Sequence, residues 1–309
     1  MSTPPTQEKF LNRLSNRSLH ILKWTMLHLP FWIIALVFKP LFLIAVACLK
    51  KQRKICEMNL HSVYLQTKTP QEYKAMAKAC IRDIGHSMMD MLFYVNRPNK
   101  LNKIAEFYGE EHLKAAMEKG KGVIGVTAHL GNFPLLFLSL VQKGYKVNVI
   151  IRPMRNKNFS EFMFDLCAQW KINMIQTFPT KVFLKETLGA LKRNELLFIL
   201  LDEEAKQEAG VMVDFLNNRV SRAIGPLLFH KRTDSSILPI FIIKENKNFK
   251  IFIEPTLEVE TKYSAEENDQ RNISALTRVI ESFVKQYPKQ WGGWLNKRWT
   301  ESNQPPTRI

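Results

Sequence analysis

Apolar and polar positions follow one another along the chain in blocks that predict strands alternating with helices. Short apolar runs bounded by polar or turn residues predict strands, and longer blocks with apolar residues at helical spacing predict helices. Strands that alternate with helices predict an α/β fold, a mixed central sheet flanked by helices. The predicted strands are 123–126, 146–151, 174–177, 196–201, 211–216, 237–244 and 250–254, and the predicted helices are 70–94, 112–119, 159–170, 181–192, 225–231 and 265–287.

The central block, residues 123–138, reads V-I-G-V-T-A-H-L-G-N-F-P-L-L-F-L. An apolar strand leads to a lone histidine, His129, and the turn residues Gly131, Asn132 and Pro134 precede a second apolar segment, which we expect to be a helix. Open α/β sheets bind their ligands at the carboxyl ends of the strands, where this histidine falls. Two interpretations stay open: a general base with a pKa near working pH, or a histidine bonded within a core turn.

Other polar groups also end predicted strands. Asp202, Glu203 and Glu204 follow the apolar strand 196–201. A catalytic histidine needs a carboxylate that orients its ring, so this acidic cluster is a candidate partner. The alternative interpretation is a turn whose carboxylates are exposed to solvent. Arginine binds phosphate, and the helix expected from 225 offers amide donors at its start. The candidate arginines, each of which could instead be a surface charge, are Arg152, Arg219 and Arg222.

The amino-terminal part of the chain predicts a membrane anchor. Residues 1–23 are polar and basic, whereas residues 24–49, which begin with Trp24 and end with Leu49, are almost wholly apolar. About 20 apolar residues span a bilayer, but Lys39 and Pro40 interrupt this run. The run is therefore a kinked span or an interfacial anchor, with a buried soluble helix as the alternative. We expect a boundary near residue 50, with the anchor in 1–50 and one α/β domain in 51–309.

Charge and composition limit the classes of partner that we expect for this chain. The 309 residues carry 45 Lys and Arg against 28 Asp and Glu, a net charge of +17 that favours a polyanionic partner. A basic cluster at 50–54 suits an anionic lipid surface, and signatures of nucleic-acid-binding modules are absent. Four cysteines without C-x-x-C spacing favour reduced thiols in the cytosol. The histidine spacing predicts no metal site, and Walker, Rossmann and G-x-S-x-G patterns are absent.

Several motifs, in this order, resemble the bacterial lipid A biosynthesis acyltransferases, the late acyltransferases of lipopolysaccharide assembly. The resemblance runs from about Lys51 to Trp299 and thus covers most of the chain. The motifs are Asn59-Leu60, T-A-H-L-G-N-F-P around His129, R-P-M-R-N at 152–156, L-L-D-E-E, V-M-V-D-F-L-N-N-R-V-S-R-A-I-G-P, Y-P-K-Q-W and W-L-N-K-R-W.

The resemblance implies an O-acyltransferase that moves a fatty acyl group from acyl carrier protein to a hydroxyl of a lipid A precursor. It implies a place at the bacterial inner membrane, with the catalytic domain facing the cytoplasm. Acyl carrier protein, anionic lipid or lipid A precursor and the membrane would be its partners, without nucleic acid. No cofactor or metal would be needed beyond acyl carrier protein as co-substrate. The implied site residues are His129 and Asp202 for catalysis, and Asn132, Arg152, Arg219 and Arg222 for substrate binding.

Two departures from the family pattern leave alternatives open. The family has Asp or Glu five positions after its histidine, where this chain has Pro134. Asp202, or alternatively Glu203 or Glu204, would then have to supply the carboxylate, or Asn132 the orienting group. Asn218 also stands where the family commonly has glycine. The alternative functions are acyl transfer to another glycolipid or phospholipid-like acceptor, or a catalytically silent member that binds lipid.

Overall fold

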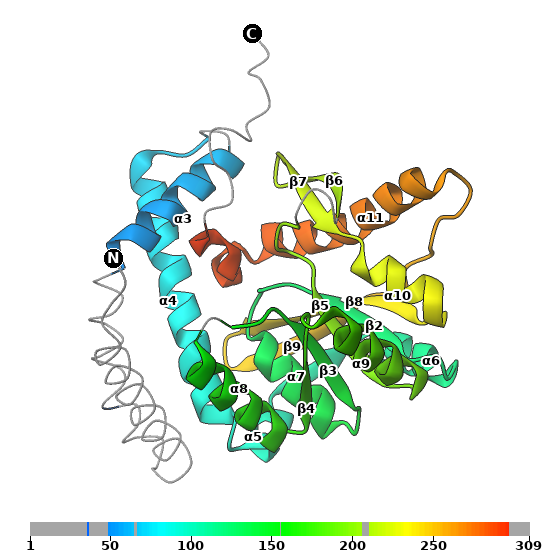
Figure 1. Ribbon diagram of the computed structural model, residues 1–309. Helices are drawn as coiled ribbons and strands as arrows, with labels where there is room; N and C mark the ends of the chain where they lie inside the picture. The colour runs from blue at the N-terminus through cyan, green and yellow to red at the C-terminus, as the bar shows by residue number, and fades with distance from the viewer. Residues whose placement is uncertain (1–35, 37–48, 65–66, 155, 206–209, 297–309) are drawn as a thin grey trace, which may run out of the picture.

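A seven-stranded mixed sheet in the strand order β1-β9-β8-β2-β5-β3-β4 forms the centre of the computed structural model (Figure 1). The structure describes residue 36 and residues 49–64, 67–154, 156–205 and 210–296. The five strands from β8 to β4 are parallel, and β9 and β1 run antiparallel to them. The strands are β1 (Ala105–Tyr108), β2 (Val123–Thr127), β3 (Val147–Ile151), β4 (Ile172–Gln176), β5 (Leu196–Leu200), β8 (Ser236–Glu245) and β9 (Asn248–Ile253).

Helices cover both faces of this sheet, as the apolar character of its strands requires. All five residues of β2 are buried, which is typical of a parallel strand packed on both sides. In β2, Ile124 and Val126 belong to one core cluster and Val123 to the other. The helices are α3 (Lys50–Val63), α4 (Pro70–Tyr94), α5 (Pro98–Asn102), α6 (Glu110–Glu118), α7 (Phe133–Gln142), α8 (Lys157–Gln169), α9 (Thr180–Lys192), α10 (Gly225–Thr233) and α11 (Ala265–Gln286).

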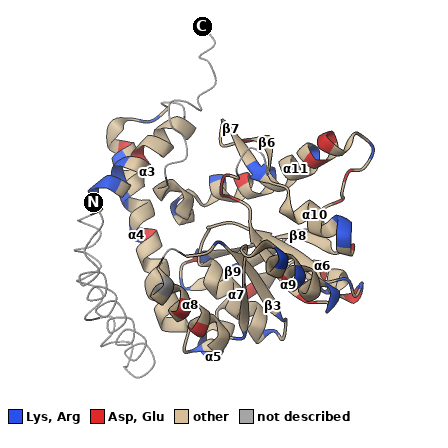
Figure 2. Ribbon diagram, viewed as in Figure 1, with Lys and Arg blue, Asp and Glu red and all other residues tan. Residues whose placement is uncertain are grey.

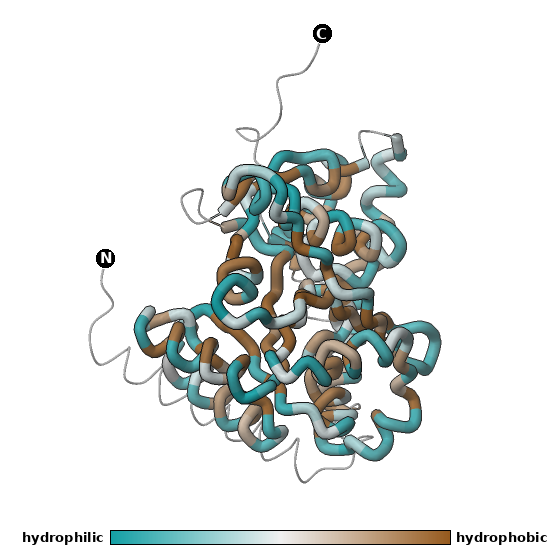
Figure 3. The backbone as a smooth tube through the Cα atoms, turned by 90° about the vertical axis from the view of Figure 1, so that its right-hand side faces the viewer, coloured by the Kyte–Doolittle hydropathy of each residue, from teal (hydrophilic) through white to brown (hydrophobic). Residues whose placement is uncertain are grey.

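The two cores take their residues from different helices. One cluster contains residues of α3, α4, α9, α10 and α11, and the other contains residues of α5, α6 and α7. Seen from the side, apolar segments run through the middle of the molecule and hydrophilic segments lie mostly outside (Figure 3). The expected α/β fold, a mixed sheet flanked by helices, is therefore confirmed.

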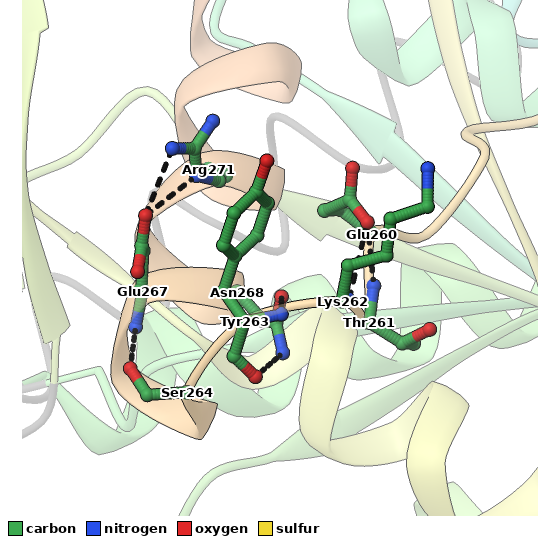
Figure 4. Close-up of polar contacts among 8 residues, drawn as sticks. All are labelled: Glu260, Thr261, Lys262, Tyr263, Ser264, Glu267, Asn268 and Arg271. Carbon is green, nitrogen blue, oxygen red and sulfur yellow. Dashed lines mark hydrogen bonds and ion pairs between the residues drawn. The ribbon is translucent and has the colours of Figure 1, made fainter.

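Local sequence signals explain where the longer helices begin. Thr69 caps α4: its side chain accepts a hydrogen bond from the amide of Glu72, whose carboxylate accepts one from the Thr69 amide, and Pro70 follows as the first helical residue. Ser264 caps α11 through the amide of Glu267. One turn later, the guanidinium of Arg271 donates a hydrogen bond to the carboxylate of Glu267 (Figure 4). These start points agree with the periodicity of the sequence.

Among the α-helices and strands of the described residues, α3, α5, β1 and β7 (Asn218–Ala223) lie outside the predicted pattern. The motif that contains Arg219 and Arg222 forms β7. This strand pairs antiparallel with β6 (Gly210–Phe215) in a separate two-stranded sheet. Charged residues interrupt the apolar pattern of this hairpin, at the exposed Asp214 and Arg219 and at the buried Arg222, so the sequence did not predict this strand.

The carboxyl-terminal segment folds back across the domain to α3 and α4 (Figure 1). It contains two short 3-10 helices, η2 (Pro288–Gln290) and η3 (Gly292–Leu295). Asn59 of α3 holds this segment because its side-chain amide donates to the carbonyl oxygens of Trp294 and Asn296, both at 2.8 Å. Asn59 is 3% exposed, so these bonds satisfy a buried polar group.

The predicted membrane anchor falls on residues 24–49, of which the structure describes Leu36 and Leu49, so it remains a prediction. Within the described part of the chain, no helix has the length and apolarity needed to cross a bilayer.

Candidate active site

His129 and Asp202 meet at the carboxyl edge of the sheet because their strands are neighbours in register. In the pairing of β2 with β5, Thr127 lies opposite Leu200, so the residues two positions further on lie side by side. The Nδ1 atom of His129 is 2.8 Å from Oδ1 of Asp202. The structure therefore brings together the histidine and the carboxylate that the sequence analysis paired.

Asp202 is fully buried, and both of its carboxylate oxygens are engaged. Oδ1 faces His129, and Oδ2 accepts a hydrogen bond from the indole Nε1 of Trp291 at 2.8 Å. A buried carboxylate is stable only when such partners replace its water shell. Trp291 is itself fully buried against Phe215 and Trp294, so the position of its N–H is fixed by packing.

The backbone of the histidine turn is held by the same carboxyl-terminal segment. The amide of Gly292 donates to the carbonyl oxygen of His129 at 2.7 Å, and the amide of Gly131 donates to that of Gln290 at 2.9 Å. Gly131 has a φ of +59°, and a Cβ there would lie 1.9 Å from the carbonyl oxygen of Ile242. The turn therefore requires glycine at this position.

The other ring nitrogen of His129 points toward the open side of the site. Its side chain is 33% exposed, and Nε2 lies 4.0 Å from Oε1 of Glu203. Arg152 contacts the same carboxylate, with its guanidinium 3.4 Å from Oε2, and also donates to the carbonyl oxygen of Glu204. Arg152 therefore lines the same cavity as His129 and pairs with Glu203, and its role in substrate binding stays a prediction.

A large apolar cavity of about 580 Å³ begins at His129. Two of its polar lining residues reach solvent, since the side chain of His129 is 33% exposed and that of Arg152 is 69% exposed. The deeper wall is built by residues of α7, β3, α8, β4 and β5, most of them aliphatic, aromatic or sulfur-containing, including Met163, Leu166 and Cys167. Burial raises the pKa of the Cys167 thiol to about 11, which indicates how poorly this region hydrates a charge.

This arrangement is suited to general-base catalysis on a hydroxyl. When Nδ1 carries the proton and donates a hydrogen bond to Asp202, Nε2 keeps a lone pair that faces the cavity. The buried carboxylate holds the ring in this tautomer and stabilises the imidazolium that forms on proton uptake. Among the described residues, no group of three or more His, Cys, Asp or Glu side chains is placed to hold a metal ion.

Pro134 and Asn132 belong to the turn but do not orient the ring. Pro134 lies in the first turn of α7 and lines the cavity. Asn132, 3% exposed, donates from its side-chain amide to the carbonyl oxygen of Ser87 at 2.7 Å. Asn132 therefore fastens the turn to α4, and Asp202 is the group that contacts the imidazole.

The three candidate arginines do not lie together. Arg222 is 1% exposed, with its guanidinium 4.5 Å from the ring centre of Phe215, and Arg219 is exposed on the β6–β7 hairpin. Neither residue lines the cavity at His129. The hairpin thus turns Arg222 inward against Phe215, and substrate binding by Arg219 and Arg222 stays a prediction.

Sequence reasoning missed the role of Trp291, which was noted only as part of the carboxyl-terminal tryptophan signature. Asp202 and Trp291 are 89 positions apart, and no local pattern connects an indole N–H to a particular carboxylate. The order of the motifs alone marked this tryptophan as a residue of interest.

Comparison with known proteins agrees with the resemblance seen in the motifs. The profile described as "Bacterial lipid A biosynthesis acyltransferase" matches residues 12–301. A lipid A biosynthesis acyltransferase of Haemophilus influenzae is 24% identical over 250 residues, 78% of this chain and 74% of the relative. A lipid A biosynthesis palmitoleoyltransferase of Escherichia coli is 20% identical over 282 residues, 89% of this chain and 87% of the relative. A phosphatidylinositol mannoside acyltransferase of Mycobacterium tuberculosis is 22% identical over 187 residues, 59% of this chain and 56% of the relative.

Proposed function

Because the chain belongs to the bacterial lipid A biosynthesis acyltransferase family, we propose that it transfers a fatty acyl group from acyl carrier protein to a hydroxyl of a lipid A precursor. The observation that carries this proposal is the pair of His129 and Asp202 beside an apolar cavity of about 580 Å³. A base beside a long apolar space is what transfer of an acyl chain to a hydroxyl requires.

The reaction runs through His129 as general base. Nε2 takes the proton of the acceptor hydroxyl while the oxygen attacks the carbonyl carbon of the thioester. A C–O bond forms, the C–S bond breaks, and the leaving thiolate receives the proton from the imidazolium. Asp202 stays ionised throughout and stabilises the imidazolium, supported by the N–H of Trp291.

The first turn of α7 can stabilise the oxyanion of the tetrahedral intermediate. This helix begins at Phe133, next to the histidine turn, and the amino end of a helix carries partial positive charge. Pro134 has no backbone N–H, and in the first turn of a helix this N–H would have no partner within the helix.

The donor is assigned to the large cavity. A saturated acyl chain gains about 0.8 kcal/mol for each methylene buried, and the deep wall of this cavity is apolar. Acyl carrier proteins are acidic, so a chain with a net charge of +17 is suited to them.

A location at the inner membrane, with the catalytic domain facing the cytoplasm, is part of the same proposal. It is supported by the basic start of α3, where Lys50, Lys51, Arg53 and Lys54 are partly or fully exposed (Figure 2). Such a cluster is attracted to the anionic cytoplasmic leaflet, at about 1 kcal/mol for each basic residue near the surface.

The test is an acyl-transfer assay with the full chain in detergent micelles. Acyl carrier protein loaded with a labelled acyl chain is the donor and a tetra-acylated lipid A precursor the acceptor, with product mass as the readout. We expect transfer by the wild type and a loss of about 10²–10⁴-fold in kcat/KM for His129→Ala. His61→Ala, an exposed histidine of α3, is the matched control. Absence of transfer by the wild type to any acceptor would contradict the proposal and favour a silent lipid-binding protein.

A second candidate acceptor is another glycolipid. The mycobacterial relative is named as an acyltransferase of phosphatidylinositol mannoside, so related chains are named for different acceptors. The same assay separates the two, with a phosphatidylinositol mannoside offered in parallel. Faster transfer to that acceptor than to the lipid A precursor would overturn the acceptor assignment and leave the chemistry intact.

A further inference from the structure

Helix α9 presents a row of exposed lysines on the side turned away from the core. Lys181, Lys185 and Lys192 are all exposed, and their spacing of four and then seven residues keeps them on one face over about three turns. The side chains that α9 buries lie on the opposite side of the helix, at Thr187, Ala190 and Leu191. The lysines therefore form one basic stripe that faces solvent (blue on α9 in Figure 2).

Two apolar side chains are exposed at the start of the same helix. Phe178, in the loop before α9, is 67% exposed, and Val182, in the first turn, is 48% exposed. Lys185 follows Val182 by three positions and so lies beside it on the helix surface. Large apolar side chains that are exposed close together are typical of a contact site for a partner. The apolar pair thus continues the lysine stripe toward the loop before the helix.

This loop borders the large cavity. Thr177 and Arg152 both line that cavity, and the amide of Thr177 donates to the carbonyl oxygen of Ile151 at 3.0 Å. Phe178 follows directly. Because α9 connects the carboxyl end of β4 to the amino end of β5, the stripe begins at the edge of the sheet that holds His129 and runs down its flank. A partner bound along the stripe therefore reaches the cavity at one end.

We propose that the α9 surface, formed by Phe178, Lys181, Val182, Lys185 and Lys192, is the docking site for the acyl carrier protein that delivers the donor chain. The lysines attract the acidic side chains of the carrier, and the two apolar residues pack against it next to the cavity. The acyl chain crosses the loop before α9 and enters the large cavity, while the carrier stays outside. This inference rests on the proposed function and extends it to the surface that recognises the donor.

The charge of this face supports an acidic partner. Glu186 is an exposed carboxylate on the same side of α9, so three lysines stand against one glutamate. Arg193, just after the helix, is not counted with them, since its Nε lies 2.9 Å from Oε1 of Glu195. Complementary charge raises the rate of association with an acidic protein, and salt weakens this attraction.

The position of α9 favours a soluble carrier over the lipid bilayer as the occupant. The basic start of α3, which supports the proposed membrane location, lies on the opposite side of the molecule from α9 (Figure 1). A bilayer that contacts α3 thus leaves the α9 surface facing the cytosol, where an acylated carrier arrives.

The test measures carrier binding and kinetics in matched variants of the full chain in detergent. We expect Lys185→Glu to raise the Kd for the holo carrier, and the KM for the acylated carrier, about tenfold at low salt. The rise should shrink at high salt, because exposed charges are screened. The acceptor KM and kcat should change less than about twofold. Lys78→Glu, which alters an exposed lysine of α4, is the matched control and should leave all of these constants unchanged. Thermal unfolding verifies that both variants fold.

A donor without a protein carrier isolates the docking step. The same acyl chain is offered as a thioester of pantetheine, which enters the cavity but has no acidic surface. The wild type and Lys185→Glu should use this thioester equally. Phe178→Ser should raise the carrier Kd about fivefold and also use acyl-pantetheine as the wild type does.

The outcomes separate docking from catalysis and from membrane binding. A wild-type carrier Kd in Lys185→Glu, or an equal loss with acyl-pantetheine, would overturn this inference and leave the transferase function intact. Weaker binding of Lys185→Glu and Phe178→Ser to phosphatidylglycerol vesicles, with carrier affinity unchanged, would make the α9 surface a membrane contact instead. Carrier binding that depends on Lys185 without transfer to any acceptor would support the inference and overturn the transferase function alone.

Discussion

The indole N–H of Trp291 donates to Oδ2 of Asp202 at 2.8 Å, on the opposite side of the carboxylate from the His129 ring. The same segment donates a backbone hydrogen bond from Gly292 to the carbonyl oxygen of His129. One turn near the carboxyl terminus thus positions both members of the proposed catalytic pair. Trp291 is a positioning residue that acts through Asp202.

Trp291→Phe should lower kcat about tenfold with the acceptor KM unchanged. The variant keeps an aromatic ring in the core but removes a hydrogen bond to a charged group, which contributes about 1.5–3 kcal/mol. The matched control is Trp294→Phe, whose indole donates to the carbonyl oxygen of Pro288 instead. Steady-state kinetics beside thermal unfolding make the comparison. Equal losses of kcat in the two variants would reduce Trp291 to a packing residue.

Pro134→Ala should keep kcat/KM within about threefold of the wild type, equivalent to about 0.7 kcal/mol in the barrier. Pro134 occupies the position of the family's acidic residue, but the carboxylate at His129 comes from Asp202. Alanine is compatible with the first turn of α7 and leaves that pair intact. A loss of tenfold or more in kcat/KM in an acyl-transfer assay, with normal thermal unfolding, would show that Pro134 itself contributes to catalysis.

Cys167→Phe should shift donor preference toward shorter acyl chains. Cys167 lines the large cavity, and a phenyl ring there removes volume from its deep part. Each methylene that no longer fits forfeits about 0.8 kcal/mol, or about fourfold in apparent affinity. Competition between donors of different chain length, read by product mass, measures the shift. Unchanged selectivity would place the donor chain elsewhere.

The thiol of Cys167 should react slowly with iodoacetamide at neutral pH. Burial raises its pKa to about 11 from an ordinary value of 9.0, so in the folded protein half of the thiol is ionised only near pH 11, whereas in the unfolded chain it ionises near pH 9. The unfolded chain loses this proton first, so the free energy of unfolding contributed by this group falls as pH rises through the same window. Peptide mass spectrometry across pH follows the reaction, and half-maximal reactivity near pH 9 would contradict the burial argument.

Much of the fold could be predicted because its strands and helices carry strong periodicity. The apolar runs that became β2 and β5 placed His129 and Asp202 at strand ends, and their adjacency in the parallel sheet made the pair. The predicted helix 70–94 agrees with α4, whose start the Thr69 cap and Pro70 explain. These signals are local, and they agree with the packing.

The rest depended on contacts between distant segments. Pairing of β7 with β6 turns Arg222 inward, and nothing in the spacing of Arg219 and Arg222 distinguishes a buried guanidinium from an exposed one. The bond from Trp291 to Asp202 and a small cavity lined by α4 and the carboxyl-terminal segment both need the chain to fold back on itself. Such features become visible only when the elements are assembled.

The most direct measurement is a double-mutant cycle on the catalytic pair, with kcat/KM of the wild type, His129→Ala, Asp202→Asn and the double variant. Asp202 acts only through the His129 ring, so we expect Asp202→Asn to lose at least about tenfold, or 1.4 kcal/mol in the barrier. The double variant should then be no slower than His129→Ala, because residues that act as a unit are not additive. Losses that multiply, or an Asp202→Asn variant with nearly full activity, would contradict the account.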